Sequence, residues 1–248
     1  ALMPAILLTC SGCLPHTELN RQAIVEAIGV DYSDDGYEVS VQYFNMEESG
    51  GSTFVDSSKA NVVVVKGRGT DIQTALESAS VKCGQPFMFG ITSVIVFGEE
   101  AAKRDLVKSL SFAETYYQSN PTTLIAVAKG KASDIMDVQF KDGVVSVEHL
   151  CQLMTHAEQL GLGETKPLYK VMNELRQPTG CTVLPLIVSA MTESGTTDDG
   201  KIVELSGGAL LAERVLADTI SLSDLSGLQF LNDAIINTSF SAAADGQN

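Results

Sequence analysis

Cys10 and Cys13 are the first residues whose types and spacing suggest chemistry, in the run Cys10-Ser11-Gly12-Cys13. A CxxC pair has a redox role where it lies between a strand and the start of a helix in a thioredoxin-like unit, and no such pattern follows it. A metal site needs about four ligands, and this pair with the nearby His16 falls short of that number. Lipid attachment to Cys13 fits the small residues before it best, while redox, metal-binding and inert readings stay open.

Residues 1–12 have the character of the second half of a signal sequence. They are apolar and end in small residues immediately before Cys13. The run is too short to span a bilayer, which takes about 20 apolar residues. Ser11-Gly12-Cys13 resembles a bacterial lipoprotein box, although Cys10 stands where leucine is usual. We therefore predict that residues 1–13 are a truncated signal sequence and lipobox, with the lipid on Cys13.

Gly67-Arg68-Gly69 lies between a predicted strand and a predicted helix, which is also the place of a dinucleotide-binding loop. The third glycine of that fingerprint is replaced by Ile72, and the chain has no GK[ST] sequence typical of a P-loop. These glycines are therefore expected to serve the turn. Asp34 and Asp35 also predict a turn, because a calcium loop needs ligands at alternate positions over about a dozen residues.

The histidines and carboxylates form no recognisable catalytic set. His149 and His156 are two helical turns apart, about 10.5 Å along the axis, which is too far to share one metal ion. The chain has no GxSxG or HExxH sequence, and its 31 acidic residues make any chosen carboxylate pair uninformative. The sequence thus predicts no catalytic, cofactor-binding or metal-ligating residues, and surface positions for both histidines.

The composition limits the classes of protein to which this chain can belong. The 248 residues are 44% hydrophobic, which is enough for a substantial core, and the net charge of −15 argues against nucleic acid as a partner. Five cysteines at irregular spacing support neither a disulfide framework nor a paired zinc site. Cys83 and Cys151 fall on apolar helix faces and are predicted to be small core residues.

The run from residue 61 to 98 is the organising unit of the predicted fold. Four consecutive valines (62–65) predict a strand buried on both faces, and residues 87–97 predict a second strand parallel to it. Between them, Thr70 is the predicted N-cap of a helix, with Gln73 completing a capping box. The helix buries a stripe of residues at helical spacing, which are Ile72, Ala75, Leu76, Ala79 and Cys83.

The rest of the chain alternates strands and helices. Residues 23–45 predict a hairpin around the turn 33–36, and residues 46–60 predict an exposed loop. Further helices are predicted over 98–113, 130–138, 146–160, 165–177 and 221–231, and strands over 122–128, 184–191, 202–205 and 209–212. This pattern predicts an α+β fold of mixed sheets and amphipathic helices, with an N-terminal domain over 14–180 and a second small domain over 181–248.

Several stretches along the chain together resemble the pattern of one known family. Gly12-Cys13, then Glu18-Leu19 and AIVEAIGVDY, resemble the start and adjoining strand of that family. Its later segments are matched in the same order by GRGTDIQTAL, SVIVFGEEAAK, AVAKGKASDI and GGALLAERVLADTISLSDLSGLQFLN. The family that these stretches resemble is the Ger(x)C spore germination lipoproteins. The chain departs from the family at Leu14 and Phe230, where tryptophans are usual, at Leu211, where an aromatic residue is usual, and near Thr92, where histidine is usual.

The resemblance implies a lipid-anchored, non-catalytic C subunit of a nutrient germinant receptor, with no cofactor. It implies integral-membrane receptor subunits as partners and a place on the outer face of the inner spore membrane. It also implies a further C-terminal domain in family members that this chain lacks. The alternative from another class is a lipid-anchored extracytoplasmic solute-binding protein or hydrolase, which a deep pocket with perturbed carboxylates or aromatic residues would favour.

Overall fold

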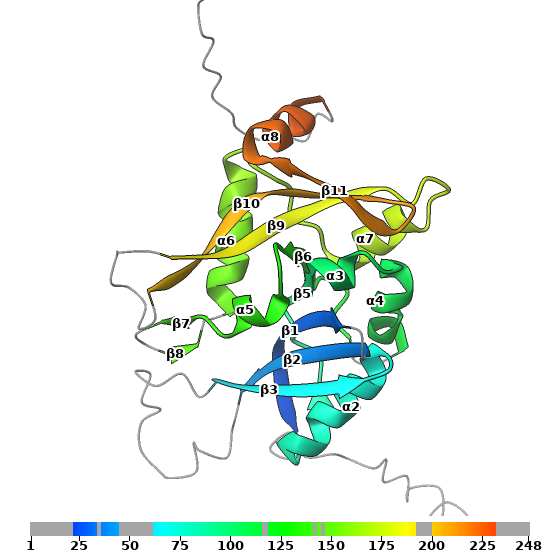
Figure 1. The fold of residues 1–248 in the computed structure, drawn as a ribbon, viewed down its shortest axis with the longest axis vertical. Coiled ribbons are helices and arrows are strands. Elements are labelled where there is room, and N and C mark those ends of the chain that lie inside the picture. Colours follow the sequence, from blue (N-terminus) through cyan, green and yellow to red (C-terminus); the bar gives the residue numbers. More distant parts are fainter. Residues whose placement is uncertain are drawn as a thin grey trace, which may run out of the picture.

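The computed structural model describes residues 22–33, 36–44, 62–115, 119–140, 143–144, 147–191 and 200–231. Eight strands of its main sheet run in the order β11-β10-β9-β6-β5-β1-β2-β3, and the short strand β4 pairs beside β1 (Figure 1). The strands of this sheet are β1 (Ala23–Ser33), β2 (Gly36–Phe44), β3 (Val62–Gly69), β4 (Phe87–Met88), β5 (Val94–Gly98), β6 (Leu124–Ala128), β9 (Thr182–Met191), β10 (Lys201–Ala212) and β11 (Val215–Ser221). A separate hairpin pairs β7 (Gln139–Phe140) with β8 (Gly143–Val144).

Helices cover both faces of the sheet, which confirms the predicted α+β class. They are α2 (Ile72–Cys83), α3 (Glu99–Ala102), α4 (Leu106–Thr115), α5 (Ala132–Met136), α6 (Val147–Gln159), α7 (Leu168–Leu175) and α8 (Leu222–Leu231). Buried side chains of α2, α3, α4 and α7 share one hydrophobic cluster with one face of the sheet. Those of α5 and α6 form a second cluster with the opposite face.

Strand β1 lies near the centre of the sheet and carries the predicted hairpin. It pairs antiparallel with β2 from Ser33↔Gly36 inward, and parallel with β4 and β5 on its other edge. Gly36 has φ of 119°, a backbone conformation that glycine adopts without steric cost, so the hairpin prediction is confirmed. Asp34, Asp35 and the predicted loop 46–60 lie outside the described residues.

The predicted strand–helix–strand unit forms, with two corrections. Strand β3 runs antiparallel to β2 and hence parallel to β1 and β5, as predicted. It is an edge strand, however, and the Val63 side chain is 37% exposed, so the prediction of burial on both faces is wrong. The predicted strand 87–97 is divided into β4 and β5, because residues 89–93 leave the ladder between them.

The glycines of Gly67-Arg68-Gly69 serve close packing, which corrects the predicted turn. Both lie within β3, under helix α2. A Cβ atom on Gly67 would lie 2.1 Å from the carbonyl oxygen of Ala75, and one on Gly69 would lie 2.3 Å from Oγ1 of Thr74. Such distances are far inside van der Waals contact, so only glycine lets α2 lie this close to the strand.

The N-cap of α2 is Asp71, which corrects the predicted box of Thr70 and Gln73. The backbone N–H of Thr74 donates to Oδ1 of Asp71 at 2.8 Å, and the N–H of Asp71 donates to Oγ1 of Thr74 at 3.2 Å. The predicted stripe is confirmed at Ile72, Ala75, Leu76 and Ala79, which are buried, whereas Cys83 is half-buried. Gly84 ends the helix in the left-handed conformation, as a C-cap glycine does.

Later elements follow the predicted periodicity with shifted boundaries. The predicted helix 98–113 is two helices, α3 and α4, and its predicted inward residues Ala102, Leu106, Leu110 and Ala113 are all buried. Helix α7 begins at Leu168, because Pro167 is its N-cap. The predicted strands 202–205 and 209–212 are one strand, β10, with an irregularity between Leu205 and Gly207. Strand β11 was not predicted from the sequence.

Strands β9 to β11, which lie beyond the predicted boundary at 180/181, belong to the same sheet as β1. They are attached through β6, which pairs with β9 at two positions, Val127↔Leu186 and Ala128↔Ile187. Leu184 of β9 and Ala209 of β10 are buried in the cluster that also contains Ile28 of β1. The division into two domains stays a prediction, and the segments on either side of it share one sheet and one core.

We expect Asp71→Ala to lower the free energy of unfolding by about 1 kcal/mol, because it removes the side-chain acceptor of the α2 cap. Thr70→Ala is the matched control and should stay within about 0.5 kcal/mol. Urea denaturation at pH 7 measures both. Equal losses at the two positions would contradict the assignment of Asp71 as the cap.

Glu26 of β1 is an acidic residue placed in the central part of the sheet. Its burial raises the pKa of the carboxyl group, because the charged form loses hydration. A carboxyl pKa that is higher in the folded state lowers the free energy of unfolding at pH values above the ordinary glutamate pKa. This loss disappears at pH values where the group is protonated in both the folded and the unfolded state. We therefore expect Glu26→Gln to raise the melting temperature at pH 7 and to leave it unchanged near pH 3.

Glu204→Gln is the control for this prediction, because Glu204 is exposed on β10. It removes the same charge without removing a desolvated carboxylate, so its melting temperature should change little at either pH. Thermal unfolding followed by circular dichroism gives the comparison. A Glu26→Gln variant that is less stable than the parent at pH 7 would show that the carboxylate makes a favourable interaction.

Candidate functional site

The predicted lipid-attachment site lies outside the described residues. This holds for Cys13, and also for Cys10 and His16, so the assignment of the lipid to Cys13 stays a prediction. Among the helices that the structure describes, none has the length and apolar character needed to cross a membrane.

The described cysteines and histidines do not come together. His149 and His156 are exposed on α6, as predicted. In the described parts of the chain, His, Cys, Asp and Glu side chains form no group of three or more suited to a metal ion. Cys151 is half-buried, and burial, aided by the nearby Glu148, raises the pKa of its thiol. This thiol is therefore protonated at neutral pH, and a protonated thiol is a poor nucleophile.

At the carboxyl edge of the sheet, the protein fills an anion position with its own carboxylate. In open sheets with parallel strands, ligands bind beyond the carboxyl ends of the strands, and helix N-termini there attract anions. Asp31, near the end of β1, is buried and accepts the N–H groups of Ala132 at 2.7 Å and Ser133 at 2.9 Å, at the start of α5. A Cβ atom on Gly98, at the end of β5, would lie 2.1 Å from Oδ1 of Asp31. Glycine at 98 thus makes this internal cap possible.

An open groove lies next to this edge, between α2 and α4. This α2–α4 groove has a volume of about 460 Å³, and its lining includes Tyr32, Tyr37, Ile72, Arg104, Lys108 and Phe112. The guanidinium carbon of Arg104 lies 4.0 Å from the centre of the Tyr32 ring. The rings of Tyr32 and Tyr37 meet edge to face, with centroids 5.0 Å apart, and the Tyr37 hydroxyl lies 3.4 Å from Oγ of Ser109. No pattern in the sequence predicted that these residues come together.

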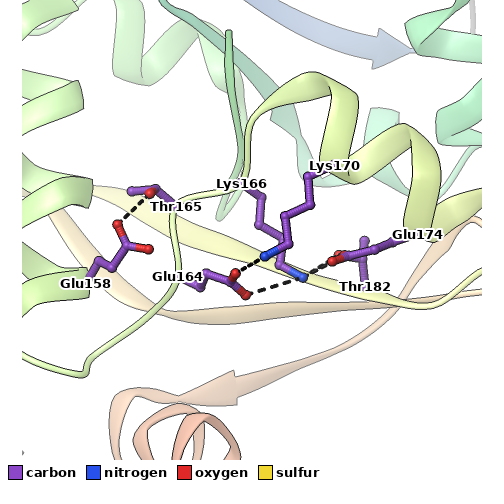
Figure 2. Close-up of polar contacts among 7 residues, drawn as sticks. All are labelled: Glu158, Glu164, Thr165, Lys166, Lys170, Glu174 and Thr182. Carbon is purple, nitrogen blue, oxygen red and sulfur yellow. Dashed lines mark hydrogen bonds and ion pairs between the residues drawn. The ribbon is translucent and has the colours of Figure 1, made fainter. Parts of the chain in front are cut away.

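A buried lysine forms a second polar cluster, at the connection between α6 and α7 (Figure 2). The Lys166 side chain is 9% exposed, and its Nζ lies 2.6 Å from a carboxylate oxygen of Glu174 and 3.6 Å from one of Glu164. It also donates to Oγ1 of Thr182 at 3.2 Å, at the start of β9. Lys170 pairs with the other oxygen of Glu164, and Thr165 donates to Glu158 at 2.6 Å.

The Lys166 cluster fills the space beside the start of β6, away from its two pairs with β9. There the N–H of Ile125 donates to the carbonyl oxygen of Lys166 at 3.0 Å, so the segment 165–167 lies alongside β6. The Lys166 ammonium then reaches β9 through Thr182 and α7 through Glu174. Through these contacts the cluster connects β6, α7 and β9.

We expect Lys166→Met to lower the free energy of unfolding by about 3 kcal/mol, because Glu174 and Thr182 lose a buried charged partner. Lys170→Met is the control, since the Lys170 side chain is 40% exposed and its ion pair should contribute about 0–1 kcal/mol. Urea denaturation of both variants gives the values. A loss at Lys166 no larger than that at Lys170 would mean that the cluster does not hold β9 in place.

Sequence comparison places this α+β domain, with its open groove and internal charge clusters, in a known class. Residues 15–189 match the family model described as the spore germination protein N-terminal domain. This match covers more than half of the chain. The chain therefore belongs to the family of spore germination proteins with this N-terminal domain, and the predicted Ger(x)C membership is confirmed.

Two relatives come from Bacillus subtilis (strain 168). The putative spore germination protein YfkR is 23% identical over 239 residues, which are 94% of this chain and 60% of that protein. Spore germination protein KC is 29% identical over 143 residues, which are 55% of this chain and 35% of that protein. The crystal structure of the GerBC protein gives a TM-score of 0.41 at 12% identity, over 84% of this chain and 56% of that chain. The chain thus spans less than two thirds of the length of these relatives.

Proposed function

We propose that this protein is a lipid-anchored, non-catalytic subunit of a spore nutrient germinant receptor. In this proposal Cys13 carries the lipid on the outer face of the inner spore membrane, and the folded domain docks to integral-membrane receptor subunits. The observation that carries the proposal is the match of residues 15–189 to the spore germination family. Both B. subtilis relatives bear spore germination names, which supports the same process.

The position of Cys13 supports the anchor. The family match begins at residue 15, so Cys13 stands immediately before the domain and after the apolar residues 1–12. Residues 14–22 would reach at most about 30 Å if fully extended, which keeps β1 close to the membrane surface. A tether of this length raises the effective concentration of the domain near membrane subunits, so that a weak interface suffices.

The two buried charge clusters of the described residues have partners within the protein. The anion position at the start of α5 is occupied by Asp31, and Lys166 is enclosed by its own carboxylate partners. The solute-binding alternative is favoured by one observation, which is the α2–α4 groove, whose volume falls in the range of small-molecule sites. Within the described ranges, no comparable observation favours the hydrolase.

We expect Cys13→Ala to abolish most of the germination response that depends on this gene, while responses through receptors with other C subunits persist. The physical reason is the loss of the acyl chains, each buried CH₂ of which contributes about 0.8 kcal/mol to membrane affinity. The measurement is the fall in optical density of a spore suspension after germinant addition. Cys10→Ala is the control and should behave as the parent.

Fatty-acid labelling decides which cysteine is modified. Labelled palmitate should enter the parent and the Cys10→Ala variant, and not Cys13→Ala. Incorporation that survives Cys13→Ala would contradict the anchor. Full germination by an unanchored form in spores lacking the partner subunits would contradict the docking role itself.

A further inference from the structure

The α2–α4 groove contains two acidic residues whose carboxylates are already engaged. Asp71 accepts the N–H of Thr74 at the start of α2, and this bond lowers the pKa of the Asp71 carboxyl. Asp105 accepts the N–H of Lys108 at 3.2 Å at the start of α4. Both carboxylates thus cap the helices that form the walls, and the helix N-termini are closed by the protein itself.

The two basic residues that line the groove, Arg104 and Lys108, differ from the paired bases of the described chain. Lys66, Arg68, Lys103, Lys166, Lys170 and Arg176 each form an ion pair with a carboxylate. Over the described ranges, neither Arg104 nor Lys108 forms an ion pair, although acidic residues outnumber basic ones by 31 to 16. The groove therefore presents two basic side chains that form no ion pair with a described residue, next to the two capping carboxylates Asp71 and Asp105.

Arg104 is held in an orientation that suits carboxylate recognition. Its guanidinium lies over the Tyr32 ring at 4.0 Å, and Tyr32 is supported by the edge-to-face contact with Tyr37. Stacking covers one planar face of a guanidinium and leaves its N–H groups, which point outward in the plane, able to bind a carboxylate with two parallel hydrogen bonds. The stack also reduces the side-chain entropy that Arg104 would lose on binding.

The rest of the lining is partly apolar and partly polar. Ile72 of α2 and Phe112 of α4 contribute to its apolar part, together with the half-buried Tyr37 ring. The polar part consists of Thr70, Gln73, Ser109, Ser111 and Thr115. The volume of about 460 Å³ exceeds what an inorganic anion needs. A ligand with a negative group and an apolar body can therefore use both the basic side chains and the apolar part of the groove.

We propose that the α2–α4 groove binds a small organic carboxylate with an apolar body. The carboxylate pairs with the guanidinium of Arg104 and the ammonium of Lys108, and the body lies against Tyr37, Ile72 and Phe112. This inference goes beyond the proposed function and does not depend on it, because neither the anchor nor a membrane partner contributes a residue to the groove.

The experiment is an NMR titration of the ¹⁵N-labelled full chain at constant ionic strength with four probes: hexanoate, benzoate, acetate and inorganic phosphate. Hexanoate and benzoate should bind saturably, with shifts at the amides of residues 32, 37 and 104–108, and at least about tenfold more tightly than acetate and phosphate. Arg104→Ala and Lys108→Ala should each weaken hexanoate binding, Arg104→Ala by about tenfold, since it removes charge-assisted hydrogen bonds.

Lys129→Ala is the matched control, because Lys129 is an exposed base outside the groove. It removes the same charge and should leave hexanoate affinity unchanged. Arg104→Lys keeps the charge and loses the planar pair of donors, so it should fall between the parent and Arg104→Ala. The amide spectrum of each variant reports its folding in the same experiment.

Three results would overturn the inference. One is the absence of saturable binding by all four probes up to about 50 mM, which corresponds to an affinity too weak for a specific site. Another is phosphate binding as tightly as hexanoate, which would leave the apolar lining without a role. The third is an equal effect of Arg104→Ala and Lys129→Ala. None of these results bears on the anchor at Cys13.

Discussion

The junction of β6 and β9 is the constraint on which the rest of the sheet depends. In the described sheet, two ladder pairs and the hydrogen bond from the N–H of Lys129 to the carbonyl oxygen of Ile187 join these strands, and β9, β10 and β11 connect to the rest of the sheet through β6. The segment containing Lys166 lies alongside the start of β6, and its ammonium connects to β9 and α7. A buried lysine is costly to desolvate, so a compact cluster of Glu164, Glu174 and Thr182 is needed around it. The continuous sheet is thus stabilised by charges that serve structure.

A buried carboxylate also stabilises the carboxyl edge of the sheet. Asp31 ties the end of β1 to the start of α5, with Gly98 of β5 giving it room. In many α/β enzymes this edge is left open for an anionic substrate. Here the edge is closed, and the open volume lies beside it in the α2–α4 groove. The charges at this edge thus hold elements of the fold together.

Local patterns predicted the elements well, because helical spacing and turn chemistry act over a few residues. The buried stripe of α2 and the hairpin at Gly36 are examples. The long-range contacts had no such signal: Asp31 and Ala132 are 101 positions apart, and Arg104 meets Tyr32 from a different element. The cap of α2 was misassigned by one residue, since Thr70 and Asp71 are both good caps and only the backbone path selects Asp71. The sequence around Gly67 predicted a turn, whereas in the structure this glycine allows α2 to pack closely against β3.

Co-purification is the direct test of the proposed docking to integral-membrane receptor subunits. A tagged full chain would be isolated from detergent-solubilised inner membranes of dormant spores, and the bound proteins identified by mass spectrometry. We expect recovery of polytopic membrane proteins encoded with this gene, in near-constant ratio to the chain. Untagged spores supply the background. Recovery of the chain alone, at full expression and from intact spores, would rule out stable docking.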